Sequence, residues 1–198
     1  MKEYLIAFED KVAKMFKEGK IRGPVHLSGG NEDELERIFT RIYHRDWVFS
    51  THRWHYHYLL KGGKPEDIVN HLTEHPDKTM TMFDKKLNFL SSAIVGGCIP
   101  IAVGTALAIK MRGDASNVYC FVGDAATDAG HFFEAVRFAD SYDLPITFII
   151  EDNGYSCDTL IGDRWGDEPE CAVHSMRIEY YMYDRKWPHV GIGEHVCF

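Results

Sequence analysis

The stretch from Val118 to Tyr155 constrains the fold of this chain more than any other. It contains two apolar runs, residues 118–122 and 145–151, which have the length of buried strands. Between them, residues 130–141 carry apolar side chains at helical spacing. A strand, a helix and a second strand of this size predict a βαβ unit, in which the two strands are parallel. We therefore expect an α/β fold with a parallel sheet and helices on both of its faces.

The rest of the chain adds further elements to this unit. Residues 46–60 are aromatic and rich in histidine, with a short extended piece at 47–49, and residues 76–90 are expected to form a loop. Apolar spacing and cap residues predict further helices at residues 3–18, 31–43 with Asn31 as N-cap, 65–74 with Pro65 in the first turn, and 92–110. The pattern weakens after Asp158, so we expect one domain over residues 1–198, in which residues 159–198 form a divergent C-terminal tail.

Composition narrows the function classes. The chain has 198 residues, 45% of them hydrophobic and 26% charged, which suits one globular domain. A formal net charge of -8 argues against a nucleic-acid partner, because such proteins usually present a basic face. No apolar run reaches the ~18 residues of a membrane span. The five cysteines form no CxxC pair, and the amphipathic N-terminal stretch does not resemble a signal peptide, so we expect reduced thiols and a cytoplasmic location.

Polar residues follow both strands of the βαβ unit. Asp124 follows the first strand and Asn153 follows the second. Ligands of parallel sheets bind outside the carboxyl ends of the strands, so both side chains are expected to face one crevice. A carboxylate and an amide oxygen suit Mg²⁺, which completes its shell with water and phosphate oxygens. Gly123, Ala125 and Ala126 are small enough to let the backbone approach phosphates near a helix N-terminus. The alternative is a structural turn in which Asp124 only caps the next helix.

These residues also carry a resemblance. GDAATDAG followed by EDNGY resembles the thiamine-diphosphate motif, a Gly-Asp followed one helix and one strand later by Asn. More narrowly, the chain resembles the α subunit of the E1 component of 2-oxoacid dehydrogenases, of the pyruvate and acetoin type. Four further stretches agree with that family in order and spacing, from Met15 to Asp158: MFKEGKIRGPVHLSGGNEDE, DWVFSTHRWHYHYLLKGG, FLSSAIVGGCIPIAVGTALAIKMRG and HFFEAVRFADSYDLPITFIIEDNGYS.

The resemblance implies thiamine diphosphate and Mg²⁺ as cofactors and assigns roles to single residues. Asp124 and Asn153 would bind Mg²⁺ through their side chains, and Tyr155 through its backbone carbonyl. The residues expected at the thiamine diphosphate are His52, Arg53, Ala93, Val95, Gly123, Asp124, Ala125, Ala126, Asn153 and Tyr155. Ala93 and Val95 would lie on the aminopyrimidine side. His55 matches a histidine near the active-site mouth, where it would bind the oxoacid or order a loop.

The same resemblance implies partners. In two-subunit E1 enzymes the glutamate that activates the cofactor comes from a β subunit, so we expect a β-type partner in an α₂β₂ assembly. A lipoyl-bearing E2 acyltransferase would accept the acyl group, and the substrate would be a small 2-oxoacid. The chain departs from the family in a shorter C-terminal part, in Thr81 where a histidine is usual, and in Asp152 where an asparagine is common. His174 is a candidate replacement for a missing active-site histidine.

Two alternatives to an enzyme subunit stay open. One is a non-catalytic regulatory subunit that keeps the fold and its partner surface, and the other is an unrelated nucleotide-binding α/β protein. His52, His55 and His57 also form an H-x-x-H-x-H pattern that is compatible with Zn²⁺. No cysteine or second cluster accompanies that pattern, and the family resemblance accounts for the segment, so we favour the reading without zinc.

Overall fold

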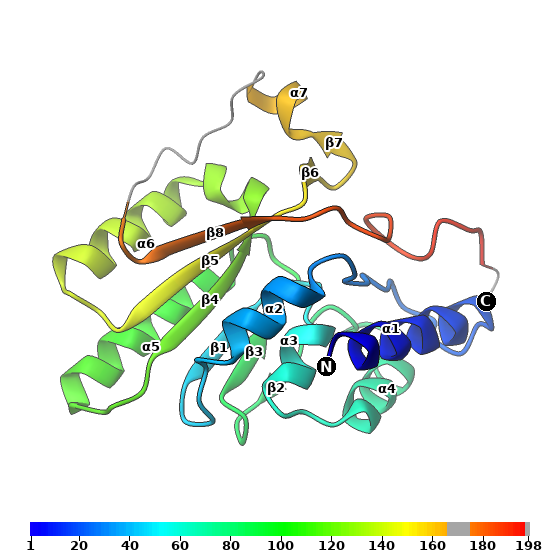
Figure 1. Ribbon diagram of the computed structural model, residues 1–198, viewed down its shortest axis with the longest axis horizontal. Helices are drawn as coiled ribbons and strands as arrows, with labels where there is room; N and C mark the ends of the chain where they lie inside the picture. Colours follow the sequence, from blue (N-terminus) through cyan, green and yellow to red (C-terminus); the bar gives the residue numbers. More distant parts are fainter. Residues whose placement is uncertain (166–174, 197–198) are drawn as a thin grey trace.

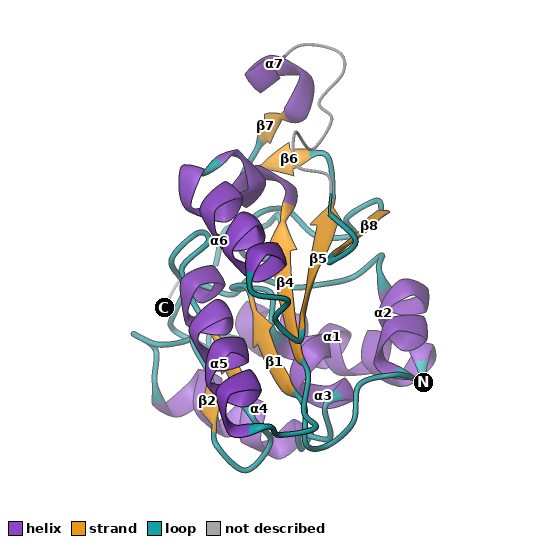
Figure 2. Ribbon diagram, turned by 90° about the vertical axis from the view of Figure 1, so that its left-hand side faces the viewer, coloured by secondary structure: helices purple, strands orange, loops and turns teal. Residues whose placement is uncertain are grey.

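A six-stranded sheet forms the centre of the protein, with helices on both of its faces (Figures 1 and 2). The computed structural model describes residues 1–165 and 175–196. The strand order is β2-β3-β1-β4-β5-β8, and every neighbouring pair is parallel except β2 with β3. The strands are β1 (Trp47–Ser50), β2 (Phe83–Asp84), β3 (Phe89–Ser91), β4 (Val118–Gly123), β5 (Ile146–Asp152) and β8 (Ile178–Met182). The expected α/β class and the βαβ unit are confirmed.

The helices form two layers. Helices α1 (Lys2–Lys17), α2 (Glu32–Phe39), α3 (His55–Leu60) and α4 (Pro65–Glu74) belong to one layer, and α5 (Cys98–Arg112) and α6 (Gly130–Ser141) to the other. A 3₁₀ turn, η1 (Asp124–Asp128), links β4 to α6. Beyond β5 lie a small hairpin, β6 (Tyr155–Ser156) with β7 (Thr159–Leu160), and the short helix α7 (Ile161–Trp165).

Alternation along β4 explains why both layers are needed. Cys120 and Val122 point toward α5 and α6, whereas Tyr119 and Phe121 point into the core beneath the other layer. Successive side chains of a strand face opposite sides of the sheet, and here both sides are buried. A strand covered on both faces reads as a continuous apolar run, which is why residues 118–122 signal a strand so clearly.

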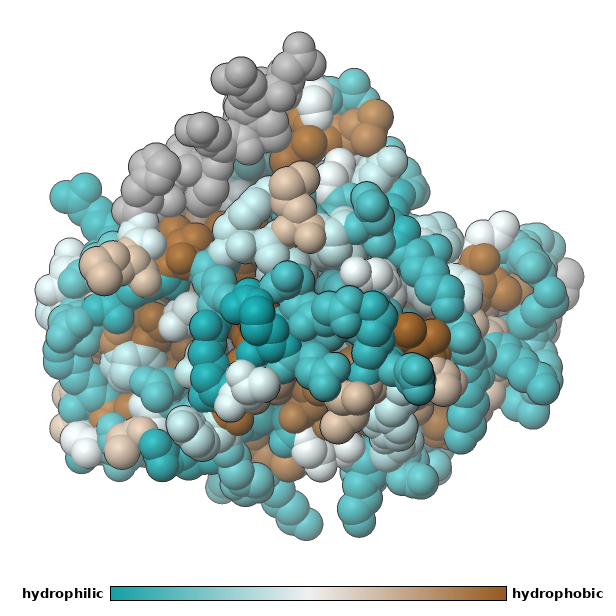
Figure 3. All heavy atoms as spheres, viewed as in Figure 1, coloured by the Kyte–Doolittle hydropathy of each residue, from teal (hydrophilic) through white to brown (hydrophobic). Residues whose placement is uncertain are grey.

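The outer surface is mostly hydrophilic on the face seen in Figure 1, with apolar side chains scattered across it (Figure 3). Within the described residues, no helix combines the length and the apolarity that crossing a membrane requires.

Several local expectations need correction. Residues 76–90 are not all loop, because they contain the short strand β2 and the start of β3. The helix expected from residue 92 begins only at Cys98, and the preceding residues form a turn at the sheet edge. Asn31 does precede α2, but its side chain makes no capping bond. Its Nδ2 instead donates to Glu151 Oε1 at 3.3 Å and to the Tyr181 hydroxyl at 3.2 Å, which links α2 to the sheet.

The segment after β8 returns across the molecule to the loop before α2. The Lys186 amide donates to the Gly29 carbonyl at 3.1 Å, and the Gly191 amide donates to the Val25 carbonyl at 2.7 Å. Gly30 has φ +103°, and a Cβ built on it would lie 2.0 Å from the carbonyl oxygen of Asp184. Glycine is therefore required at this position both by the backbone conformation and by the close approach of the chain.

Candidate functional site

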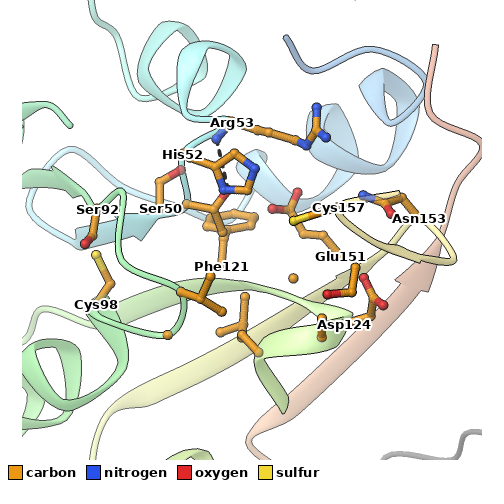
Figure 4. Close-up of a pocket in the computed structure, with 18 of the residues that line it drawn as sticks. Ser50, His52, Arg53, Ser92, Cys98, Phe121, Asp124, Glu151, Asn153 and Cys157 are labelled. Atoms are coloured by element: carbon orange, nitrogen blue, oxygen red, sulfur yellow. Dashed lines mark hydrogen bonds between the residues drawn. The ribbon is translucent and has the colours of Figure 1, made fainter. Parts of the chain in front are cut away.

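A cavity of about 120 Å³ opens at the carboxyl edge of the parallel sheet (Figure 4). Its walls come from the segments that follow β1, β3, β4 and β5, together with Tyr183 and His189 from the segment after β8. The carboxyl edge is where parallel sheets bind their ligands. Most of the expected cofactor residues line this cavity: His52, Arg53, Val95, Gly123, Asp124, Ala125, Ala126, Asn153 and Tyr155.

Asp124 begins η1 directly after β4 and is only 6% exposed. Burial, reinforced by the negative charge of Asp152, raises the pKa of Asp124 to about 6. Arg164 of α7 opposes this shift, because its Nη2 donates to Asp124 Oδ2 at 3.1 Å. The same guanidinium also pairs with Asp128, at 3.2 Å. A buried carboxylate that is held near a cation in this way is a natural ligand for a positively charged group.

Asn153 lies just beyond β5 and is fixed by two hydrogen bonds. Its Oδ1 accepts from the Tyr155 amide at 3.0 Å, and its Nδ2 donates to the Tyr183 hydroxyl at 3.4 Å. Gly154, between Asn153 and Tyr155 in the sequence, has φ +73°, a backbone conformation that favours glycine. The Tyr155 ring is covered by the Arg185 guanidinium, at 4.0 Å from the ring centroid.

The donor set fits a hard cation such as Mg²⁺. Asp124 offers a carboxylate, Asn153 an amide oxygen and Tyr155 a backbone carbonyl, and all three residues line one cavity. Arg164 now pairs with one oxygen of that carboxylate, so a metal ion here has to share Asp124 with the guanidinium or displace it.

Arg53 adds a buried positive charge to the cavity. Its side chain donates to the Leu27 carbonyl at 2.5 Å and to the His189 carbonyl at 3.4 Å. Burial lowers the pKa of this guanidinium. A guanidinium keeps its charge even so, and its five N–H donors suit a phosphate group.

Glu151 is a cavity residue that the sequence did not single out. It is the next-to-last residue of β5, and its Oε1 accepts from Asn31, from the Tyr181 hydroxyl at 2.5 Å and from His57 Nε2 at 3.1 Å. The His57 ring thus lies between Glu151 and Ser50, because its Nδ1 shares a hydrogen bond of 2.6 Å with the Ser50 hydroxyl. A chain of hydrogen bonds thus connects two residues of the cavity wall through the buried His57.

His55 lies elsewhere than expected. It does not line the cavity; it is 1% exposed, and its Nδ1 donates to Glu9 Oε1 at 2.9 Å in the layer between α1 and α3. A side chain this deeply buried has no direct contact with a molecule in the cavity. The H-x-x-H-x-H pattern is also dispersed, because His52 faces the cavity, His55 faces Glu9 and His57 faces Glu151.

Ala93 is exposed and does not line the cavity, although its neighbours Ser92 and Ile94 do. Residues 159–198 contribute His189 to the cavity wall. The candidate His174 lies outside the described residues. Sequence patterns could not single out His189, because the segment around it has no regular period and reaches the cavity only through its pairing with residues 25–29.

A family model for the dehydrogenase E1 component matches residues 1–164. The chain belongs to the dehydrogenase E1 component family. It is similar to the α subunit of acetoin:2,6-dichlorophenolindophenol oxidoreductase from Bacillus subtilis, with 34% identity over 75% of this chain and 47% of that protein. It is also similar to pyruvate dehydrogenase E1 component subunit alpha from Porphyra purpurea, with 32% identity over 75% of this chain and 48% of that protein.

The same subunit from Rickettsia prowazekii is 32% identical over 78% of this chain and 50% of that protein. This dehydrogenase E1 chain therefore spans about half the length of the curated relatives it matches. Among solved structures, a putative thiamin diphosphate-dependent enzyme from Mycobacterium smegmatis covers 70% of this chain and 24% of its own, with a TM-score of 0.44 and 20% identity. The family assignment rests on the sequence match, to which a likeness of that size adds nothing.

Proposed function

We propose that this chain is the cofactor-binding α-type subunit of a thiamine-diphosphate- and Mg²⁺-dependent 2-oxoacid dehydrogenase. One observation carries the proposal: Arg53, Asp124 and Asn153, which follow three different strands, line a single cavity at the carboxyl edge of the sheet. A guanidinium, a carboxylate and an amide oxygen are the groups that a metal-bridged diphosphate requires. Membership in the dehydrogenase E1 family supports the same chemistry.

In this proposal the residues of the chain bind and orient, while the cofactor supplies the chemistry of decarboxylation. Asp124, Asn153 and the Tyr155 carbonyl would hold Mg²⁺, and Arg53 and His52 would contact the diphosphate. The small residues Gly123, Ala125 and Ala126 would allow close approach of the backbone. Phe121 and Val122, which also line the cavity, would keep part of its wall free of water.

A β-type partner subunit is part of the proposal. Ile94 and Val95 on the cavity rim are 74% and 69% exposed, which is unusual for large apolar side chains. Helix α5 continues this surface with a face of small and apolar residues that stay exposed: Ile101, Gly104, Ala108 and Met111. Such a face suits close packing against another subunit, from which the activating glutamate would come. Transfer of the acyl group to a lipoyl-bearing E2 protein would follow in the assembled enzyme.

Calorimetry with thiamine diphosphate, with and without Mg²⁺, tests the cofactor part of the proposal. We expect saturable binding that depends on Mg²⁺ in the wild type, and its loss in an Asp124→Ala variant. An Asp114→Ala variant removes an exposed carboxylate at the opposite end of β4 from the cavity and is expected to bind normally. If Asp124→Ala binds the cofactor as well as the wild type, the metal assignment is wrong.

A non-catalytic α-like subunit is the second candidate, and the Arg164–Asp124 ion pair favours it, because a guanidinium at the carboxylate competes with a metal ion. Co-purification with a β-type subunit, followed by an assay of 2-oxoacid decarboxylation, separates the two candidates. Turnover by the complex supports the enzyme, and a stable complex without turnover or cofactor binding supports the regulatory subunit. The family match removes the earlier alternative of an unrelated nucleotide-binding protein.

A further inference from the structure

Three histidines from distant parts of the chain meet beside the cavity. They are His26 in the loop before α2, His52 after β1 and His189 in the segment after β8, and one ring nitrogen of each lies within 4.8 Å of the others. The ring centroids of His26 are 4.7 Å from His52 and 4.9 Å from His189, and those of His52 and His189 are 5.5 Å apart. Figure 4 shows His52 on the wall of the cavity, which His189 also lines.

Two of these rings carry a nitrogen without a partner. His26 Nδ1 and His52 Nε2 are buried, and neither makes a hydrogen bond with any described residue. A buried polar atom of this kind normally has a partner, because losing water without replacement costs about 1–3 kcal/mol. The His26 ring packs edge-to-face on the other two rings, which accounts for these contacts but leaves both nitrogens without a hydrogen bond.

The chemical state of the cluster suits a metal ion. Burial, together with the neighbouring imidazoles and Arg53, lowers the pKa of His26 to about 3 and of His52 to about 2, and burial also lowers the pKa of His189. All three imidazoles are therefore neutral near pH 7, which is the form that binds metals.

The backbone holds the three residues in place. The Gly191 amide bonds to the Val25 carbonyl, so His189 is fixed beside His26. Arg53, next to His52 in the chain, donates to the backbone carbonyl of His189 at 3.4 Å, which holds His52 and His189 close together.

We propose that His26, His52 and His189 form a binding site for a divalent transition-metal ion of the Zn²⁺ class, with its fourth position open to the cavity. Three imidazoles and one open position form the ligand set of a tetrahedral zinc site that exchanges its fourth ligand. Zn–N bonds of about 2.0–2.1 Å require the rings to move together by roughly 1 Å. The charge of Arg53 opposes a dication, so this site is weaker than a three-histidine site without a neighbouring cation.

This site is distinct from the Mg²⁺ site proposed at Asp124 and Asn153. Imidazole nitrogens select Zn²⁺, Ni²⁺ or Cu²⁺, whereas carboxylate and amide oxygens select Mg²⁺. The two sites therefore predict opposite metal preferences in one molecule, and the histidine site is testable without thiamine diphosphate.

The test is a titration of the untagged full chain with Zn²⁺ after removal of metals by a chelator. Isothermal calorimetry and the visible spectrum of bound Co²⁺ report stoichiometry and ligand geometry. We expect one equivalent of Zn²⁺, a tetrahedral Co²⁺ spectrum, and no competition by millimolar Mg²⁺. His189→Gln should weaken binding by at least about 100-fold, because loss of an outer-shell partner alone costs 10–100-fold.

His189 is only partly buried, so its replacement by glutamine should leave the metal-free protein folded. Equal melting temperatures of the metal-free wild type and variant would establish this, while Zn²⁺ should raise the melting temperature of the wild type alone. The matched control is His75→Gln, because His75, directly after α4, forms a pair with His71 in the last turn of that helix, with ring centroids 5.4 Å apart.

Three results would overturn the proposal. The first is a wild-type chain that binds no Zn²⁺, and the second is a His189→Gln variant that keeps its full equivalent. The third is loss of binding in His75→Gln instead, which would locate the ion at the His71–His75 pair at the end of α4.

Discussion

Arg164 Nη2 donates a hydrogen bond to Asp124 Oδ2 at 3.1 Å, so a cation of the chain itself lies beside the carboxylate that the proposed Mg²⁺ needs. The two residues are 14% and 6% exposed, and the pair stands at the cavity between η1 and α7. Whether this guanidinium excludes a metal ion or yields to it distinguishes a regulatory subunit from a catalytic one.

Replacing Arg164 by glutamine should therefore tighten the metal site. Without the guanidinium, Asp124 loses its competing partner, and the Mg²⁺ concentration for half-maximal thiamine diphosphate binding should fall several-fold, on the order of 1 kcal/mol. Arg112→Gln, which breaks an exposed pair with Asp114, is the control and should change nothing. If Arg164→Gln needs as much Mg²⁺ and as much cofactor as the wild type for half-maximal binding, Asp124 is not a metal ligand.

Lys61 should give the protein a stability that rises in alkaline solution. Burial lowers the pKa of Lys61 to about 8, although the charge of Asp46 opposes this, and its ordinary value is 10.5. Between these values the unfolded chain holds a proton that the folded chain has released, so unfolding becomes harder as pH rises from about 8 to about 10.5. The cost of burying the charge is fully present below pH 8.

Urea unfolding of the wild type and of Lys61→Met at pH 7.5 and pH 10 checks this. The stability difference between the two proteins should shift by up to about 2 kcal/mol in favour of the wild type at the higher pH. Lys64→Met, at an exposed position, should show no such shift. If the difference in free energy of unfolding between the wild type and Lys61→Met is the same at both pH values, the pKa of Lys61 is not lowered.

Gly30→Ala should detach the segment after β8. The new Cβ would lie 2.0 Å from the Asp184 carbonyl oxygen, in a backbone with φ +103°. The loop before α2 and the segment after β8 therefore have to move apart. We expect a loss of about 2 kcal/mol or more in free energy of unfolding and faster amide exchange at Lys186 and Gly191. Gly104→Ala on α5 is the matched control, since its Cβ meets nothing within 4 Å, and it should be neutral or slightly stabilising.

Glu9→Ala should destabilise the fold without affecting the cavity. Glu9 and His55 are both buried, and removing one leaves the other without its hydrogen-bond partner, at a cost of about 3 kcal/mol or more. Thermal unfolding measures the loss, and calorimetry at a temperature where the variant is folded should give unchanged cofactor affinity. Glu3→Ala, exposed on the same helix, should have little effect. A large loss of affinity would return His55 to the candidate site residues.

The sequence was most informative where structure is set locally. Strands β4 and β5 and helix α6 were predictable within a residue or so, because strands buried on both faces and a helix with one apolar side leave plain periodic patterns. Asp124 and Asn153 were predictable for a related reason, since a position at the end of a parallel strand already implies a place at the sheet edge.

The rest of the site depends on contacts between distant segments. Arg164 reaches Asp124 from a short helix, and His189 reaches His52 from a segment without periodicity. Strand β8 was missed because it is an edge strand with mixed burial, which removes the alternation that a pattern needs. Glu151 stands at the end of an apolar run, and only its three converging donors distinguish it.

Residues 183–191 reach the ribosome exit after every strand of the sheet, yet they bring Tyr183 and His189 to the cavity and pin the loop at residues 25–29. A chain whose sheet is formed but whose segment 183–191 has not docked therefore lacks one wall of its cavity. Ligand binding would then require this docking step, in which the segment packs against a loop near the beginning of the chain.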